Sequence, residues 1–277
     1  MALRLKGGRA GRTRRRAGAL VGIVLAALPC GCAPPRPGWV RIPAGTYEIG
    51  SRLAPRDNPP RLVKLAAFDL GRHEVTVRDF AEYLNATGRS PAAQPHPDLR
   101  RRGTAWVPAA GRARKPITTI RHDEAVVYCQ WLSIRTGRRC RLPTIEEWEV
   151  AARGGIRGAP WPWGWGSPKG RMAWNLDAAA KVGRFPPNPF GLFDMAGNVW
   201  EWCAADRGGE LPARGGAWSE RDPAICEVQR IARFRADYMD ADVGFRVAAD
   251  AEAAADGPSV GNSDGWRSGR NSFNRSR

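Results

Sequence analysis

The alternation of apolar and polar residues predicts a first amphipathic helix over residues 77–85. Thr76 precedes it as an N-cap, Asp79 supplies an acid at the third helical position, and Gly88 marks its end. Because these apolar side chains recur three or four positions apart, they share one face of the helix. That face consists of Val77, Phe80, Ala81 and Leu84.

Two more helices follow in the same part of the chain. Apolar residues at helical spacing predict a second helix over 123–136, closed by Gly137. Thr144 and Glu147 have the spacing of a capping box, in which each side chain bonds the other residue's backbone N–H. A third helix should therefore begin there and end at the glycines of 154–155. Tryptophans beyond residue 156 lie among Gly, Pro and Asn without periodicity, so buried rings rather than long elements should organise this half.

Strand patterns are short. Alternating residues around a Pro-Ala-Gly sequence predict a β-hairpin over 39–51, and apolar runs predict strands over 62–68 and 243–247. The polar, proline-rich stretch 89–116 reads as one long loop, and long loops in compact domains often carry function.

The N-terminus has the pattern of an export signal. Arginines precede an apolar run of 12 residues at 17–28, which suits a signal peptide and is short for a membrane span. Cys32, preceded by a glycine, is a candidate for lipidation in a bacterial lipoprotein; an ordinary signal peptide or an uncleaved anchor is the alternative. We expect a signal at 1–32, a linker at 33–38, one domain at 39–249, and a disordered polar tail at 250–277.

Charge adds little to this picture. The formal net charge is +17, but seven basic residues without any acid lie in 1–32, and the body of the chain retains about +7 without basic runs. No nucleic-acid-binding motif accompanies the charge, so we predict no nucleic-acid partner. Export implies an oxidising compartment, in which cysteines tend to pair. The disulfide candidates are Cys129, Cys140, Cys203 and Cys226.

Several segments occur together in one order that is specific in combination. They are RIPAGTYEIGS (41–51), EVTVRDFAEYL (74–84), RLPTIEEWEVAARGG (141–155), GLFDMAGNVWEW (191–202), RGGAW (214–218) and GFRVA (244–248). In this order they resemble the formylglycine-generating-enzyme, or sulfatase-modifying-factor, family. The resemblance implies an α+β, loop-rich domain of the C-type-lectin-like fold. It also implies that Arg141 ties a helix start to an acid, that tryptophans such as Trp148 fill the core, and that Asn198 forms a tight turn.

The resemblance also indicates where the chemistry of the family would lie. Oxidases of the family hold Cu(I) through two cysteines, and the matching positions here are Glu220 and Ile225. A carboxylate is a poor ligand for this soft ion, so Cu(I) is not expected. Cys226 could act only in a variant site, and a structural disulfide with Cys203 is the preferred reading. Relatives that use non-haem iron need several histidines, which the three of this chain do not supply.

A structural calcium ion is the other cofactor that the resemblance implies. The matching ligands are Asp194, Gly197, Val199 and Glu201, with a weaker second site at Asn175 and Leu176. Carboxylate and carbonyl oxygens suit this hard cation. The alternative is that the two acids only bond turn amides.

Function remains divided between two classes. The missing copper pair favours an exported, non-catalytic binding or scaffold module, with an exported protein or peptide as partner and a signal or lipid anchor at the membrane. The alternative is a copper- and oxygen-dependent oxidase that converts a cysteine to formylglycine. A carbohydrate-binding role rests on the fold alone. The resemblance also makes Arg214, Arg233 and Arg246 candidates for lining the groove in which relatives bind peptide; a buried or surface ion pair is the alternative for each.

Overall fold

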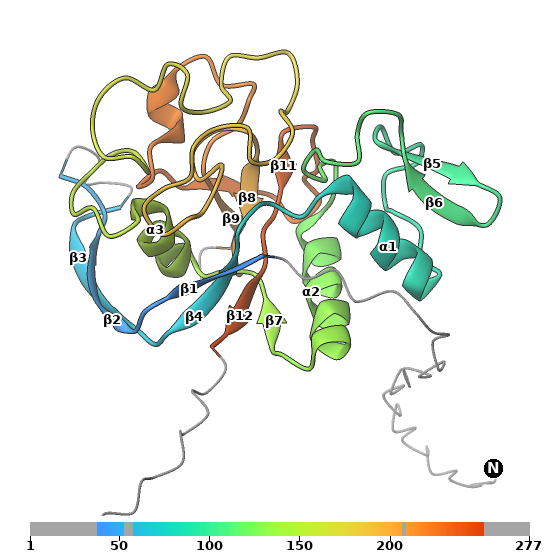
Figure 1. Cartoon of the computed structure of the whole chain (residues 1–277), viewed down its shortest axis with the longest axis horizontal. Coiled ribbons are helices and arrows are strands. Elements are labelled where there is room, and N and C mark those ends of the chain that lie inside the picture. Colours follow the sequence, from blue (N-terminus) through green and yellow to red (C-terminus); the bar gives the residue numbers. More distant parts are fainter. Residues whose placement is uncertain (1–37, 53–57, 207–208, 252–277) are drawn as a thin grey trace, which may run out of the picture. The chain divides into compact units, whose positions relative to one another are not determined.

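The computed structural model describes residues 38–52, 58–206 and 209–251, and all of them belong to one compact unit. The predicted signal, nearly all of the predicted linker and nearly all of the predicted tail lie outside the described residues. Within the described part, short strands and three helices are connected by long irregular segments (Figure 1). This composition confirms the predicted α+β, loop-rich class.

One four-stranded sheet joins the two ends of the domain. Its order is β1 (Trp39–Ile42), β4 (Phe68–Gly71), β12 (Ala248–Asp250) and β7 (Cys140–Arg141), with antiparallel neighbours. The strand pairing closes the domain, because the first and last strands both flank β4 (Figure 1).

A second four-stranded sheet carries the tryptophan-rich motif. Its order is β10 (Ala232–Phe234), β9 (Leu211–Arg214), β8 (Trp200–Trp202) and β11 (Val243–Gly244). Strand β11 runs parallel to β8, whereas β8 and β9 are antiparallel. The predicted last strand over 243–247 is therefore split: its start pairs here, and the chain then enters β12 of the first sheet.

Two hairpins complete the strands and correct two predictions. The expected hairpin over 39–51 is wrong, because β2 (Gly45–Ile49) pairs with β3 (Arg61–Leu65) rather than with β1. Burial explains the difference: Val40 and Ile42 of β1 lie in the core beside β4. The stretch 89–116 is not one loop, since it contains the hairpin β5 (Leu99–Arg102) and β6 (Ala105–Pro108).

The three predicted helices are confirmed with their caps. They are α1 (Val77–Thr87), α2 (His122–Thr136) and α3 (Ile145–Arg153). The α1 and α3 capping boxes form as expected, and each helix is followed by a glycine in the left-handed conformation. The core gathers the large rings, with Trp148 and Trp202 fully buried as predicted. No helix in the described residues has the length and apolar character needed to cross a bilayer.

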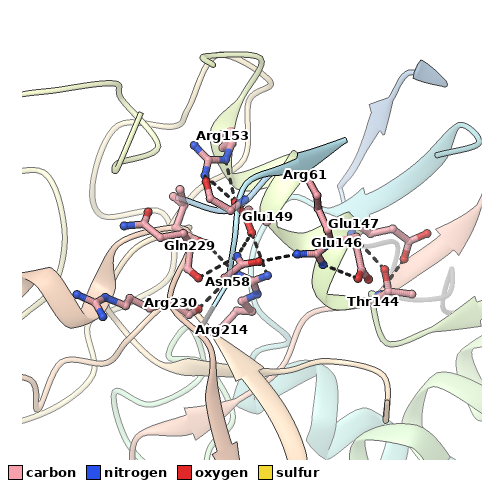
Figure 2. A network of polar contacts seen from close by, with 12 residues as sticks. Asn58, Arg61, Thr144, Glu146, Glu147, Glu149, Arg153, Arg214, Gln229 and Arg230 are labelled. Atoms are coloured by element: carbon pink, nitrogen blue, oxygen red, sulfur yellow. Dashed lines mark hydrogen bonds and ion pairs between the residues drawn. The ribbon is translucent and has the colours of Figure 1, made fainter. Parts of the chain in front are cut away.

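A buried ionic network binds α3 to three distant segments (Figure 2). The Glu149 carboxylate accepts hydrogen bonds from the Gly50 N–H at 2.7 Å and from the Asn58 side chain at 2.7 Å. It also pairs with the guanidinium groups of Arg153 at 2.6 Å and Arg214 at 3.0 Å. Burial opposes ionisation, but the two arginines outweigh it and hold the pKa of Glu149 below its usual value. The charge is thus fully paired in the interior.

Removal of this carboxylate should destabilise the fold strongly. In Glu149→Ala, Arg214 would keep its positive charge in the interior without an acidic partner, and breaking a buried pair this way costs about 3 to 5 kcal/mol. We expect that loss in the free energy of unfolding measured by urea titration. Glu48→Ala is the matched control, because Glu48 pairs with Arg157 at the surface and exposed pairs contribute about 0 to 1 kcal/mol. Equal losses in the two variants would contradict the role assigned to Glu149.

Candidate functional site

The WEW strand β8 places a second acid at the centre of the domain. Both oxygens of Glu201 accept hydrogen bonds from Arg246 at 2.6 Å, and one also accepts from the Trp148 indole N–H at 2.6 Å. All three side chains are fully buried. The charge of Glu201 is therefore neutralised by Arg246, which in turn donates to backbone carbonyls including that of Phe193 at 3.0 Å.

A pair of carboxyl groups lies beside this ion pair. Glu74 is buried and accepts a hydrogen bond from the Asn198 amide at 2.7 Å. Its other oxygen has no donor unless Glu74 and Asp194 share a proton, in which case the two side chains bond each other. Burial raises the pKa of Asp194 to about 6 and raises that of Glu74. Three buried carboxyls thus surround the single guanidinium of Arg246.

The predicted tight turn at Asn198 is confirmed, and it holds this pair in place. Asn198 has a positive φ of 67°, and its side-chain oxygen accepts from the Ala180 N–H at 2.9 Å. The same amide donates to Glu74. Asp194 also has a positive φ, 56°, and accepts from the Gly183 N–H at 2.7 Å. The turn therefore fixes two acids and the loop that faces them.

These observations bear on the predicted calcium ligands. Glu201 has its oxygens engaged by Arg246 and Trp148, so it contributes charge rather than an unused oxygen. The part of the predicted ligand set around Asp194 does fit a hard cation. A buried oxygen of Glu74 lacks a hydrogen-bond partner there, and the local charge is negative. Among the described residues no group of three metal-binding side chains occurs, so the carbonyls of Gly197 and Val199 would have to complete the shell.

The weaker calcium candidates lie elsewhere on an exposed loop. The Asn175 N–H donates to the Glu220 carbonyl at 2.9 Å, and the Leu176 N–H donates to the Trp218 carbonyl at 2.8 Å. Both residues therefore help to attach this loop to the segment after the RGGAW sequence. Calcium binding at either site stays a prediction.

The position of the family's copper pair holds no pair of thiols. Glu220 accepts a hydrogen bond from the Trp200 indole at 3.1 Å, and burial together with neighbouring acids raises its pKa. Ile225 is partly exposed and lies in the short 3₁₀ helix η1 (Pro223–Cys226). Cys226 is fully buried, and burial raises its pKa to about 12. A Cβ at Gly216 would clash with its sulfur, so this thiol is closely covered.

The four cysteines of the described domain are free and buried. The predicted disulfide between Cys203 and Cys226 is therefore not formed in this structure. The two thiols pack into different clusters: Cys203 belongs to the cluster that contains Trp148, and Cys226 to the cluster that contains Trp161. The other candidates, Cys129 and Cys140, share one cluster and are also free.

The three arginines named as groove candidates do not share a groove. Arg214 and Arg246 are fully buried and paired with Glu149 and Glu201. Arg233 forms a salt bridge of 2.7 Å with an acid at the surface, Asp206.

The histidines are also separate from one another. His96 contacts the Thr118 carbonyl and His122 contacts the Cys203 carbonyl, so the rings of both bond buried backbone groups. His73 lines a hollow of 390 Å³ with Glu74 and Arg114. Its Nδ1 atom is buried without a hydrogen-bond partner. The sequence offered no signal for this hollow beyond the EVT motif that contains Glu74.

Thiol accessibility tests the burial of the cysteines. We expect Cys203 and Cys226 to resist alkylation by iodoacetamide in the native protein, because both thiols are buried and their pKa values are raised. Both should react fully after unfolding without a reductant, as read by peptide mass spectrometry. Peptides that become alkylated only after reduction would instead indicate a disulfide.

Calcium should stabilise the domain through the Asp194 carboxylate. A divalent cation would offset the excess negative charge of Glu74 and Asp194, and binding to the folded state alone raises stability. We expect a rise in melting temperature on adding calcium to chelator-treated protein, and a much smaller rise in Asp194→Asn. An unchanged melting temperature in the unsubstituted protein would rule out this site.

Comparison with known proteins agrees with these motifs and this fold. The model of the sulfatase-modifying factor enzyme 1-like domain matches residues 28–251. The formylglycine-generating enzyme of Mycobacterium tuberculosis is 34% identical over 229 residues, covering 60% of this chain and 73% of that protein. A mouse relative named inactive C-alpha-formylglycine-generating enzyme 2 is 30% identical over 218 residues, covering 61% and 69%. The structure of PvdO from Pseudomonas aeruginosa matches with a TM-score of 0.66 and 27% identity, over 77% of this chain and 94% of that one. The family model matches a range that includes all of the described residues, and the chain therefore belongs to the sulfatase-modifying factor enzyme 1-like family.

Proposed function

We propose that this protein is an exported, non-catalytic binding or scaffold module built on the family's fold. The observation that carries the proposal is the replacement of the copper-binding pair by Glu220 and Ile225. Linear Cu(I) coordination needs two soft donors, and a carboxylate and an alkyl side chain supply none. The mouse relative, named as inactive, is a precedent for family members without the activity.

The rest of the domain supports a retained binding role. The buried pairs of Glu149 and Glu201 are complete, so the frame does not depend on a copper centre. A module that only binds a partner needs the fold of the family and does not need its copper site. The partner we propose is an exported protein or peptide. Export itself rests on the signal-like pattern of residues 1–32, and a bacterial periplasmic or lipid-anchored location follows from it.

The competing proposal is an oxidase that works through Cys226. Its thiol would have to become a thiolate to bind Cu(I), yet burial raises its pKa to about 12. A second thiol would also be needed, and Cys203 packs in a different cluster. These two obstacles disfavour the oxidase.

A turnover assay separates the two functions. Copper-loaded protein is incubated in air with a peptide of the form Cys-x-Pro-x-Arg, and the product is examined by mass spectrometry. We expect no conversion of the cysteine to an aldehyde, because only one buried thiol lies beside the matching position. A relative that retains both cysteines serves as the positive control.

The variant Cys226→Ser gives the assay its specificity. If the unsubstituted protein turns over and Cys226→Ser does not, the non-catalytic proposal is refuted. Equal, background-level signals in both proteins support it. Because the Cys226 sulfur is buried, circular dichroism of the variant should first establish that the fold is retained.

A further inference from the structure

We propose that the partner-binding surface of this chain is a basic hollow formed by residues 114–115 and 178–184, and that it receives an acidic segment of a partner protein. The proposal rests on the binding function proposed above and names the partner's chemistry. The hollow has a volume of 530 Å³. Its lining contains four cations and no acid: Arg114, Lys115, Lys181 and Arg184.

The positive charges of the hollow are not neutralised by direct salt bridges. Among the described residues no acidic side chain forms a salt bridge with any of the four cations. Burial lowers the pKa of Lys115, and the nearby charges of Arg112 and Lys181 lower it further, although the charge of Asp98 acts in the opposite direction. Cations crowded in this way attract an anionic ligand, because a bound carboxylate relieves their mutual repulsion.

The loop that carries half of these cations is held in place by three backbone bonds. The Ala180 N–H donates to Asn198 at 2.9 Å, and the Gly183 N–H donates to Asp194 at 2.7 Å. Between them, the Val182 N–H donates to the Arg114 carbonyl at 2.9 Å and so joins the two sides of the hollow. A site fixed before binding avoids part of the entropic cost of ordering a loop.

The same bonds favour a peptide over a free phosphate. Phosphate sites commonly use several backbone N–H groups that converge on the anion. Here the N–H groups of Ala180, Val182 and Gly183 are already bonded within the domain. What remains is a lining of separate side-chain cations and three alanines, which suits carboxylates spaced along a peptide.

A second hollow extends the surface toward buried hydrogen-bonding groups. It measures 390 Å³ and shares Arg114 and Val182 with the first. Three acids, Glu74, Asp79 and Glu82, also line it, so the carboxylates of the segment would stay at the cationic rim. His73 lines it with an unpartnered Nδ1 atom, and its pKa is lowered to about 4 by burial and by nearby arginines. A neutral imidazole can donate or accept a hydrogen bond, so it can bind the amide backbone of a segment anchored at the cationic rim.

The test measures binding of the full chain to a short fluorescent peptide of alternating glutamate and alanine, by anisotropy. We expect saturable binding that weakens as sodium chloride is added. The double variant Lys181→Glu/Arg184→Glu should weaken it about tenfold or more, because two attractive charges become repulsive. The matching glutamine–alanine peptide should not bind.

The control variant distinguishes an effect of the hollow on binding from an effect of the protein's net charge. Lys64→Glu/Arg102→Glu changes the charge of the protein by the same amount at exposed positions outside the hollow, and should leave binding within about twofold. Equal weakening by both double variants, or no weakening by either, overturns the proposal. Displacement of the peptide by an equal concentration of inorganic phosphate also overturns it, since that result indicates a simple anion site.

Failure of this inference is distinguishable from failure of the proposed function. If the acidic peptide does not bind and the copper assay shows no turnover, the binding module remains and its surface lies elsewhere. If the copper assay shows turnover that depends on Cys226, the proposed function fails whatever the peptide does.

Discussion

The structure depends on charges that are paired inside a domain with little regular secondary structure. Helix α3 contributes two neighbouring side chains to this interior: Trp148 donates to Glu201, and Glu149 pairs with Arg214. The backbone N–H and carbonyl groups of the long irregular segments are not all bonded within sheets, so side chains form hydrogen bonds with part of this buried backbone. Arg246 does this directly, since its guanidinium binds both Glu201 and the carbonyl of Phe193. A fully paired network can hold one arrangement of loops, whereas a partly paired one would be costly.

The buried ion pairs that stabilise the fold are separate from the positions that match the copper ligands of the family. The acids and arginines of the buried ion pairs come from α3, β8, β9 and the segment after β11, whereas the matching copper positions lie in and just before η1. The buried ion pairs of Glu149 and Glu201 do not involve Glu220 or Ile225, which occupy those positions. The Trp200 indole donates a hydrogen bond to the Glu220 carboxylate at 3.1 Å. The motifs that identify the family therefore report on its fold and say little about its activity.

Local signals in the sequence were sufficient for the helices but not for the strand pairing. The capping box of Thr144 and Glu147 depends on four consecutive residues, and the structure contains it; Arg141 binds the same Glu147 as expected. The supposed hairpin over 39–51 failed because strand pairing was decided by distant partners, β3 and β4. Periodicity records which residues are apolar, and it does not record which segment covers them.

The site was harder to predict for the same reason. Arg214 and Arg246 were groove candidates through the resemblance alone, and only tertiary contacts with Glu149 and Glu201 show that the alternative, a buried ion pair, applies to both. The cysteines suggested disulfides because pairing is usual after export, yet packing keeps Cys203 and Cys226 in separate clusters. The basic hollow could not be recognised in the sequence. Its cations come from two segments about 65 positions apart, and neither segment is a basic run.

One loop connects the region of Glu220, which matches a copper ligand of the family, to the proposed binding surface. It is attached at Asn175 to the backbone of Glu220, at Ala180 to Asn198, and at Gly183 to Asp194. Each attachment uses a backbone N–H, so the loop keeps its course whichever side chains it carries. The bonds at the cationic end of the loop therefore do not involve the side chains of Glu220 or Ile225. The binding surface that we propose can for this reason keep its backbone course independently of the chemistry at the matching copper positions.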